Sequence, residues 1–542
     1  MEGETMGMIF RKLVVDNYKC FRHFELDLSD QMTLLVGDNE TGKSTLIEAV
    51  NLCLTQELSG RNITYDISPY LFNRECVSEY IEALKANKKI APPHISIELY
   101  FDDSPEFASL KGTNNSKKID LPGVKILIEY DQEFSDEYQN YISSPNQIKN
   151  IPTEYYKVHW YSFANNPLTK RSLATNVTFI DTTTIRLQYG SDYYIQKIVE
   201  DSLDPNERAE LAVGYRMLKE TFANQGALKK INAKLGANKG EISNKNLQVS
   251  IDISQKANWE TNLTSYLDEI PFQHIGKGDQ SILKMLIALN RKAPDAHVIL
   301  IEEPENHLSY SRMNHLIRKV QEKCETKQVI IATHSTFVLN RLGIDKVILL
   351  SEEKRKAISL KLLSKSTQDY FQKLPGYDTL RLIIAKRPIL VEGPSDELVL
   401  QKAYFQIKGK LPEEDGFDII SVRSLAFKRF LEIAVLLDKK VAIVTDNDGD
   451  YKNNVELRYA DYFQNRNVKI HYDKNDQYKT LEPQIAKENS LKALNSLFNR
   501  DDKSKDDIVK YMIENKTDCA LQIFNYSGKI NFPQYILHAF AD

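Results

Sequence analysis

The stretch LLVGDNETGKSTLIEAV, residues 34–50, decides the fold of the first part of the chain. It fits the pattern G-x-x-x-x-G-K-[ST], with an apolar run before it and a helical pattern after it. Glycines let backbone N–H groups approach phosphates, Lys43 can reach the outer phosphates, and the Ser44 hydroxyl can bind Mg²⁺. We therefore predict a buried strand, an ATP-binding loop and a helix over residues 44–54. The residues expected at the nucleotide are Gly37, Asn39, Gly42, Lys43, Ser44 and Thr45.

Two later strands end in residues that suit the same site. VILIEEPENHLS, residues 298–309, ends an apolar strand with Glu302, which can hold Mg²⁺ through water, and Glu303, which can orient the attacking water. QVIIATHS, residues 328–335, puts His334 at a strand end near the γ-phosphate. Taken alone, these are also compatible with a charged strand end and a structural histidine. Together with the loop they predict ATP hydrolysis.

The order of apolar patterns predicts an α/β protein with more than one unit. Short alternating strands follow at residues 94–101 and 124–130, and residues 195–268, rich in Lys, Glu, Asn and Ala, are predicted to form a helical insert. A helix at residues 281–290 then begins a strand–helix alternation typical of a doubly wound sheet. A second alternation starts near Arg387 and predicts a separate α/β domain.

Acidic residues follow two strands of this second domain. ILVEGPSDE, residues 389–397, and VAIVTDNDGD, residues 441–450, each run from an apolar strand into carboxylates. Because active sites of α/β sheets form at the carboxyl ends of the strands, we expect these acids to meet there. Clustered carboxylates repel one another unless cations neutralise them, which favours Mg²⁺ or Mn²⁺ and phosphodiester cleavage. The acids concerned are Glu392, Asp396, Asp446 and Asp448.

The second acidic stretch, DNDGD, also resembles two other kinds of loop, a calcium-binding loop and a solvated turn. A calcium-binding EF-hand loop starting at Asp446 is excluded, because Gly449 is fourth and Tyr451 sixth, where that loop needs glycine sixth. A solvated acidic turn stays an alternative for DNDGD alone, and its pairing with VEGPSDE weakens it.

The first set of motifs resembles the ABC-type ATPase head shared by SMC, RecF and OLD (overcoming lysogenization defect) proteins. The residues that carry this resemblance are NYKCFRHFELDL, LLVGDNETGKSTLIEAV, ILIEEPENHL and IIATHS. It implies a Walker A loop, a Walker B strand ending at Glu302, a catalytic Glu303 and a switch His334. Gly276 to Gln280, ahead of the predicted helix, is similar to a degenerate ABC signature, whose Gly278 would contact ATP held by another subunit. This implies a homodimer or higher homo-oligomer. The Q-loop of such heads is assigned to residues 66–73 as a working hypothesis.

The second set closely resembles a TOPRIM domain, a Rossmann-like domain with a strand-end glutamate and a DxD motif. The resemblance implies that Glu392 is a metal ligand or general base and that Asp396, Asp446 and Asp448 complete the first metal site. KTLEPQI is similar to a segment that supplies a second-metal carboxylate, here Glu482, and NKTDCAL to one that bears a catalytic lysine, here Lys516.

An ATPase head followed by TOPRIM is the arrangement of the OLD family. It implies an ATP-regulated, metal-dependent DNA endonuclease or nickase in bacterial defence against phage, acting alone, with a partner protein or with retron nucleic acid. The expected segments are residues 8–194 and 269–365 for the head lobes, 195–268 for a helical dimerisation insert, and 366–542 for TOPRIM with a helical extension.

Composition sets outer limits on these expectations. The 542 residues carry a net charge of −4, so nucleic-acid binding would need a local patch. Five cysteines without CxxC spacing favour a reducing cytoplasm, and no apolar run is long enough for a bilayer. Basic candidates for DNA contact are Lys229, Lys230, Lys234, Lys239 and Lys245 in the insert, and Lys386, Arg387, Arg423, Lys428 and Arg429 beside the TOPRIM motifs.

Two rival functions remain at this stage. One is an ATP-driven, RecF-like repair clamp whose TOPRIM-like domain only docks on DNA, although a surface for a polyanion gains nothing from clustered acids. The other is an RNA nuclease or primase, although the modules that primases usually carry are absent.

Overall fold

The computed structural model describes residues 10–541 except 30, 39, 59, 170–172, 174–175, 182–186, 189–190, 193–202, 238–247, 252–258, 260–265, 292–295, 352–355, 374–378 and 423–425. Four residues singled out by the sequence, Asn39, Lys239, Lys245 and Arg423, lie outside the described residues. None of the helices in the described ranges is long and apolar enough to cross a membrane.

The head begins with an antiparallel sheet in the order β2-β1-β6-β8, with β7 and β9 also paired to β8. Its central strand β6 is buried along its whole length, on both faces, whereas β2 at the edge alternates between buried and more exposed residues. The strands are β1 (Phe10–Tyr18), β2 (Phe21–Asp27), β6 (Ile95–Phe101), β7 (Lys111–Gly112), β8 (Leu121–Tyr130) and β9 (Tyr156–Ser162). The short helices beside it are α2 (Arg74–Lys85) and α3 (Ser135–Ile142).

A second sheet of the head has the order β10-β15-β16-β3-β17-β18, parallel except for its edge strand β18. The continuous apolar runs predicted as buried parallel strands are confirmed, since all five residues of β3 are buried. The strands are β3 (Met32–Val36), β10 (Val177–Asp181), β15 (Val298–Glu302), β16 (Gln328–Thr333), β17 (Val347–Ser351) and β18 (Lys356–Ser359).

Helix α1 (Lys43–Thr55) packs between the two sheets, because it contacts β6 and β8 of the first and β15 and β16 of the second. The other face of the second sheet is covered by α7 (Lys277–Arg291) and α8 (Tyr310–Lys323), whose apolar residues share a core with β3, β15 and β16. Helix α9 (Thr336–Leu342) follows β16 directly. The first residue of α7 is Lys277, four residues before the start that the sequence predicted.

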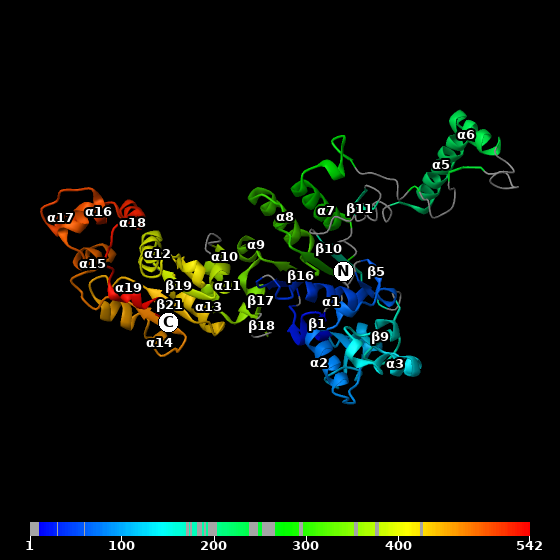
Figure 1. The fold of residues 1–542 in the computed structure, drawn as a ribbon, viewed down its shortest axis with the longest axis horizontal. Coiled ribbons are helices and arrows are strands. Elements are labelled where there is room, and N and C mark those ends of the chain that lie inside the picture. Colours follow the sequence, from blue (N-terminus) through cyan, green and yellow to red (C-terminus); the bar gives the residue numbers. More distant parts are fainter. Residues whose placement is uncertain are drawn as a thin grey trace, which may run out of the picture.

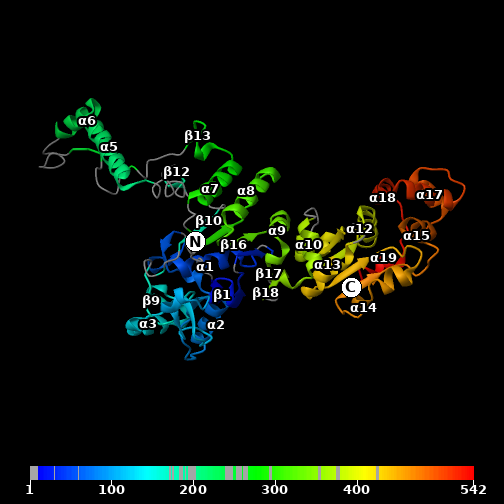
Figure 2. The same cartoon turned by 180° about the vertical axis from the view of Figure 1, so that it is seen from behind.

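The described part of the insert contains α5 (Pro205–Ala223) and α6 (Gly226–Ala237), which confirms its helical character. Both helices stand apart from the sheets of the head in Figure 1 and Figure 2. The boundaries of the four predicted segments stay predictions. The remaining short strands are β4 (Glu57–Leu58), β5 (Arg61–Asn62), β11 (Leu187–Gln188), β12 (Ser191–Asp192), β13 (Tyr266–Leu267) and β14 (Ile270–Pro271).

The C-terminal domain is built on a parallel sheet in the order β20-β19-β21-β22. Its strands are β19 (Arg387–Val391), β20 (Phe417–Ser421), β21 (Val441–Val444) and β22 (Val468–His471). Its helices are α12 (Pro394–Lys408), α13 (Phe427–Leu436), α14 (Ala460–Phe463), α15 (Leu481–Glu488), α16 (Leu491–Phe498), α17 (Lys505–Glu514), α18 (Lys516–Asn525) and α19 (Gln534–His538).

Helices α10 (Lys365–Lys373) and α11 (Thr379–Ile384) join the head to this domain. One hydrophobic cluster runs from the head sheet through Phe371 and Leu382 to Phe430 of α13. The rings of Phe371 and Phe430 lie edge to face, 5.2 Å apart. The two α/β units therefore share a buried core.

Candidate functional sites

The loop between β3 and α1 depends on its glycines. A Cβ atom on Gly37 would lie 2.7 Å from Thr41 Oγ1 and 2.8 Å from the Leu350 carbonyl oxygen, which leaves no room for a side chain. Gly42 has φ +94°, and a Cβ there would also lie 2.4 Å from the Phe21 ring. The backbone can therefore form the tight phosphate-binding turn only with glycine at these positions.

Lys43 occupies the first turn of α1 and is 6% exposed. Its Nζ donates hydrogen bonds of 2.9 Å to the carbonyl oxygens of Gly37 and Asp38. Burial lowers the pKa of Lys43, and the nearby carboxylates, Glu303 foremost, act in the opposite direction. Ser44 is exposed at the helix start and Thr45 half-buried. The loop lysine and the acids 260 residues later therefore lie within electrostatic reach.

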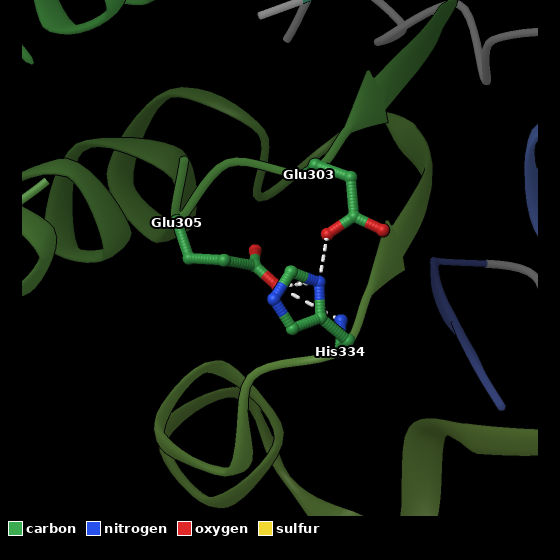
Figure 3. A group of neighbouring side chains, drawn as sticks. All are labelled: Glu303, Glu305 and His334. Carbon is green, nitrogen blue, oxygen red and sulfur yellow. Dashed lines mark hydrogen bonds and ion pairs between the residues drawn. The ribbon is translucent and has the colours of Figure 1, made fainter. Parts of the chain in front are cut away.

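The sheet order explains how these distant residues meet. Strand β16 lies between β3 and β15, so the residues after all three strands share one edge of the sheet. The Nδ1 atom of His334 lies against Oε2 of Glu303, and Figure 3 shows both side chains pointing toward each other. Burial, followed by the charge of Glu305, raises the pKa of Glu303 to about 7, while His334 acts to lower it.

Glu305 is a member of this site that the sequence reasoning missed. Its side chain is 8% exposed, and Oε1 accepts hydrogen bonds from Thr333 Oγ1 (2.6 Å) and from the backbone N of His334 (2.8 Å). Its other oxygen, Oε2, is buried without a hydrogen-bond partner. Glu305 is the third acid of the sequence EEPE, and this run of acids after a buried strand could have predicted its place in the site. We call Glu302, Glu303, Glu305 and His334 the head cluster.

The head cluster also contains a compact set of ligand atoms. One atom each from Glu303, Glu305 and His334 lies within 4.8 Å of the others, and among the described residues this is the one set of three or more potential metal ligands that is so compact. Glu302 is the last residue of β15 and is half-buried beside this set. The chemistry available is a carboxylate–imidazole pair next to a lysine and a phosphate-binding turn.

The sequence predicted the segment Gly276 to Gln280 ahead of a helix, but only Gly276 precedes α7, and Lys277 to Gln280 form its first turn. A Cβ atom on Gly278 would lie 2.4 Å from the backbone oxygen of His307, in the turn after β15. Asp279 forms an ion pair of 2.6 Å with Arg312. Packing of α7 on this turn is therefore enough to require glycine at position 278, and its contact with a nucleotide stays a prediction. The proposed Q-loop segment, residues 66–73, packs against the β1–β2 turn, where the Asn73 side chain donates to Lys19 O (2.9 Å).

In the C-terminal domain, the parallel register of β19 and β21 pairs Val391 with Val444. Glu392 and Asp446 therefore follow neighbouring strands at the same edge. The Oε1 atom of Glu392 accepts hydrogen bonds from Thr445 Oγ1 (2.7 Å) and from the backbone N of Asp446 (3.2 Å). These two acids, which the sequence predicted to meet, are adjacent.

Asp396 and Glu482 lie close to this pair. Oδ2 of Asp396 accepts from the backbone N of Gly393 (2.9 Å), which caps helix α12. Burial, then the charges of Glu392 and Glu482, raise the pKa of Asp396 to about 7. Burial, then the charges of Asp396 and Glu392, raise the pKa of Asp446 well above its ordinary value. We call Glu392, Asp396, Asp446, Asp448 and Glu482 the TOPRIM cluster.

The DNDGD loop is shaped by Asn447, which the sequence reasoning passed over. Its side chain is fully buried and its Nδ2 donates to the carbonyl oxygens of Asp473 (2.9 Å) and Asn475 (3.1 Å). Asp448 has φ +49° and an exposed side chain, and Gly449 has φ +81°. The buried asparagine fixes the loop, and the alternation D-N-D-G was its sequence signal.

Lys516 lies beside the TOPRIM cluster, at the first residue of α18. Its Nζ is 3.4 Å from Oε1 of Glu482, and Thr480 Oγ1 donates to Oε2 of the same carboxylate (2.6 Å). The structure therefore brings together Glu482 of the segment KTLEPQI and Lys516 of the segment NKTDCAL, which are 34 residues apart in the sequence.

The basic candidates of the TOPRIM domain and of the insert occupy several different places in the structure. Lys386 and Arg387 precede β19 or start it, at the opposite end of the strand from Glu392. Arg429 donates to the backbone oxygen of Ser366 (2.5 Å) and lies over the Tyr370 ring at 4.6 Å, so it connects α13 to α10. Lys428 is exposed on α13, as are Lys229, Lys230 and Lys234 on α6.

Comparison with known proteins agrees with this division. Residues 8–339 match the family described as AAA ATPase domain, and residues 383–448 match the one described as overcoming lysogenization defect protein-like, TOPRIM domain. The chain belongs to the AAA ATPase domain family, whose match spans more than half of it, and it also carries an OLD-like TOPRIM domain. By these matches it is an enzyme with an ATPase domain and a TOPRIM nuclease domain.

Two relatives that match most of the chain are named as nucleases. It is 22% identical over 471 residues to the OLD nuclease of Thermus scotoductus, covering 81% of this chain and 82% of that protein. It is 20% identical over 475 residues to the endonuclease GajA of Bacillus cereus, covering 82% and 76%. Among solved structures, the recombination mediator protein RecF is 10% identical, covering 65% of this chain and 98% of that one, with a TM-score of 0.34.

Proposed function

We propose that this chain is an ATP-regulated DNA endonuclease or nickase that cuts at the TOPRIM cluster with Mg²⁺ or Mn²⁺. One observation carries the proposal: Glu392 and Asp446 stand side by side at the carboxyl ends of β19 and β21, joined through Thr445. Clustered carboxylates at such an edge suit two-metal hydrolysis of a phosphodiester.

The TOPRIM cluster fits a divalent cation. Burial and mutual repulsion raise the pKa values of Asp396 and Asp446, so a bound cation would relieve an unfavourable charge distribution. The residues that would hold the first ion are Glu392, Asp396, Asp446 and Asp448, and Glu482 would serve a second. Such ions polarise the scissile phosphate and activate water. The Lys516 ammonium, close to Glu482, would stabilise the charge that develops on the phosphate oxygens.

In the head, the glycine-dependent turn and the buried Lys43 fit the phosphates of ATP. Ser44 and Glu302 would hold its Mg²⁺, and Glu303 would orient the attacking water. His334, held against Glu303, would report the γ-phosphate to the rest of the head. We infer that ATP is a switch for cleavage rather than the substrate of the main reaction.

The described part of the insert supports a homodimer. Leu211, Leu218 and Phe222 of α5 are exposed and, with the half-buried Tyr215, are spaced as one helical stripe. Leu218 is 64% exposed and Phe222 51% exposed, values that a second copy of the same helix would reduce by packing. Pairing of two copies would also bring the Gly278 segment of one head toward ATP of the other. We further propose a cytoplasmic role in defence against phage, alone or with a partner protein or retron nucleic acid.

The test incubates plasmid DNA with the purified chain and Mg²⁺ or Mn²⁺, with and without ATP. We expect nicking or cutting that Glu392→Gln abolishes and Glu413→Gln, an exposed acid of the same domain, leaves intact. Lys43→Ala should change only the ATP dependence. If the wild type binds DNA but never cuts it with either metal, the RecF-like clamp is the better description.

A further inference from the structure

A basic cavity opens at the edge of the TOPRIM sheet opposite to the TOPRIM cluster. Its volume is about 280 Å³, close to the lower end of the range for small-molecule sites. Residues at the beginning of all four parallel strands, β19 to β22, and of the segments before three of them form its wall. Strand β19 is five residues long, so about 15 Å of strand separate this cavity from Glu392.

The charged residues around the cavity are all cations. They are Lys386, Arg387, Lys440, Arg466 and Lys469. No described residue that lines the cavity carries a carboxylate. Asp438 lies beside the lining: its Oδ1 accepts a hydrogen bond from Asn467 Nδ2 (2.5 Å) and is 3.9 Å from Nη2 of Arg466. The register of β19 and β21 pairs Ile389 with Ala442, so Arg387 and Lys440 begin neighbouring strands side by side.

Like charges gathered at one opening repel one another and attract a multivalent anion. A phosphate group carries up to two negative charges and several strong hydrogen-bond acceptors, which suits converging lysine and arginine side chains. Cation clustering alone therefore indicates a phosphate-bearing ligand.

The apolar part of the cavity lining further restricts the chemical class of the ligand. This floor is formed by Pro388, Ile389, Val441 and Ala442, with Phe417 at one side. The Arg387 guanidinium lies over the Phe417 ring at 4.0 Å, so a flat, positively charged surface faces the cavity. Bases stack on arginine and aromatic planes, whereas inorganic phosphate has no use for an apolar floor.

We propose that this cavity binds a phosphorylated nucleoside, either as a free mononucleotide or as the phosphorylated end of a nucleic-acid strand. The site is separate from the ATP-binding turn and from the TOPRIM cluster. Ligand binding here would add a second contact for nucleic acid, or a nucleotide input, to the same domain that carries the acids.

The test measures binding to full-length Lys43→Ala protein in EDTA, so that neither the ATP-binding turn nor cleavage contributes. The probes are AMP, adenosine, inorganic phosphate, and a fluorescent six-nucleotide DNA with a 5′-phosphate or a 5′-hydroxyl. We expect AMP or the 5′-phosphorylated strand to bind, and the double variant K386E/K440E to weaken that binding at least tenfold. The control K503E/K510E makes the same charge change on two exposed lysines, one just before α17 and one on it. It should leave the binding of the probes unchanged.

The pattern among probes identifies the source of the phosphate. AMP binding tightly points to a free nucleotide, and preference for the 5′-phosphorylated strand points to a strand end. The proposal is overturned if no probe binds, if K386E/K440E binds as the control does, or if inorganic phosphate binds as well as AMP. Because cleavage is absent in EDTA, a failure of the nuclease proposal would leave this result unaffected.

Discussion

The head cluster and the TOPRIM cluster are both sets of carboxylates at the carboxyl ends of parallel strands, but they differ in their own positive charges. In the head, Lys43 and His334 lie among the acids, and both oppose the effect of burial on them. In the C-terminal domain, five acids converge, with Lys516 beside Glu482. The head therefore places more positive charge among its acids, although burial and the charge of Glu305 still raise the pKa of Glu303 to about 7.

This difference indicates how each site would use its metal. The head cluster can keep its arrangement without an ion, because the imidazole of His334 and the backbone of β16 hold Glu303 and Glu305. In the TOPRIM cluster, burial and then the charges of four neighbouring carboxylates raise the pKa of Asp446. We expect cleavage at the TOPRIM cluster to depend strongly on bound cations. The arrangement of the head cluster should depend on them much less.

The largest expected effect comes from Asp446→Asn. It removes a carboxylate at the centre of the TOPRIM cluster, so plasmid cleavage should fall on the order of 1000-fold. ATP turnover, measured on the same preparation, should be unchanged. The control is Asp450→Asn, since Asp450 accepts a hydrogen bond from Asn453, three residues further on (2.5 Å). An equal fall in both activities would mean that the two clusters are not separate sites.

Glu303→Gln should reduce ATP turnover by about 100-fold, the usual scale for loss of a general base. ATP binding, followed by equilibrium titration, should persist because Lys43 and the turn are untouched. Cleavage supported by metal alone should also persist. Unchanged turnover would remove Glu303 from the hydrolysis step.

Glu305→Gln should lower ATP turnover by about tenfold. The amide keeps one oxygen for Thr333 and the backbone of His334, but it loses the negative charge beside the imidazole. The loss should appear in kcat with little change in KM for ATP, and Glu305→Asp should recover part of it. A loss as large as that of Glu303→Gln would show that Glu305 acts on the reacting atoms directly.

The smallest effect is thermal. Binding of Mg²⁺ at 100 times its Kd adds about 2.7 kcal/mol to the native state, so saturating metal should raise the Tm by roughly 2 to 5 °C. Asp446→Asn should remove most of this rise, and Glu303→Gln should retain it. A rise that depends on Glu303 instead would reverse the comparison between the clusters.

Local motifs made much of this molecule predictable from sequence. The loop at residues 37–44 and the strands ending at Glu302 and Glu392 are short patterns in which neighbouring residues fix the local geometry. The α/β class followed from the same strands, because a continuous apolar run predicts a strand buried on both faces.

Properties that depend on packing were missed. Glu305 joins the head cluster only through the pairing of β15 with β16, which no short pattern encodes. Helix α7 begins at Lys277 because Gly278 packs against the turn at His307, although glycine is a weak helix former. Lys386 and Arg387 were expected beside the acids, yet a whole strand separates them from Glu392.

The hydrophobic cluster that runs from the head sheet to α13 also determines how the chain should melt. Lys439, in the TOPRIM domain, donates to the carbonyl oxygens of Ile383 (2.5 Å) and Ala385 (2.6 Å) at the end of α11, and Glu432 accepts from Thr367 Oγ1 (2.6 Å). Opening this junction would expose apolar side chains to water. It would also leave buried polar groups on both sides without their hydrogen-bond partners. Calorimetry should therefore record the second head sheet and the TOPRIM sheet in one endotherm, a single cooperative unit that contains both sites.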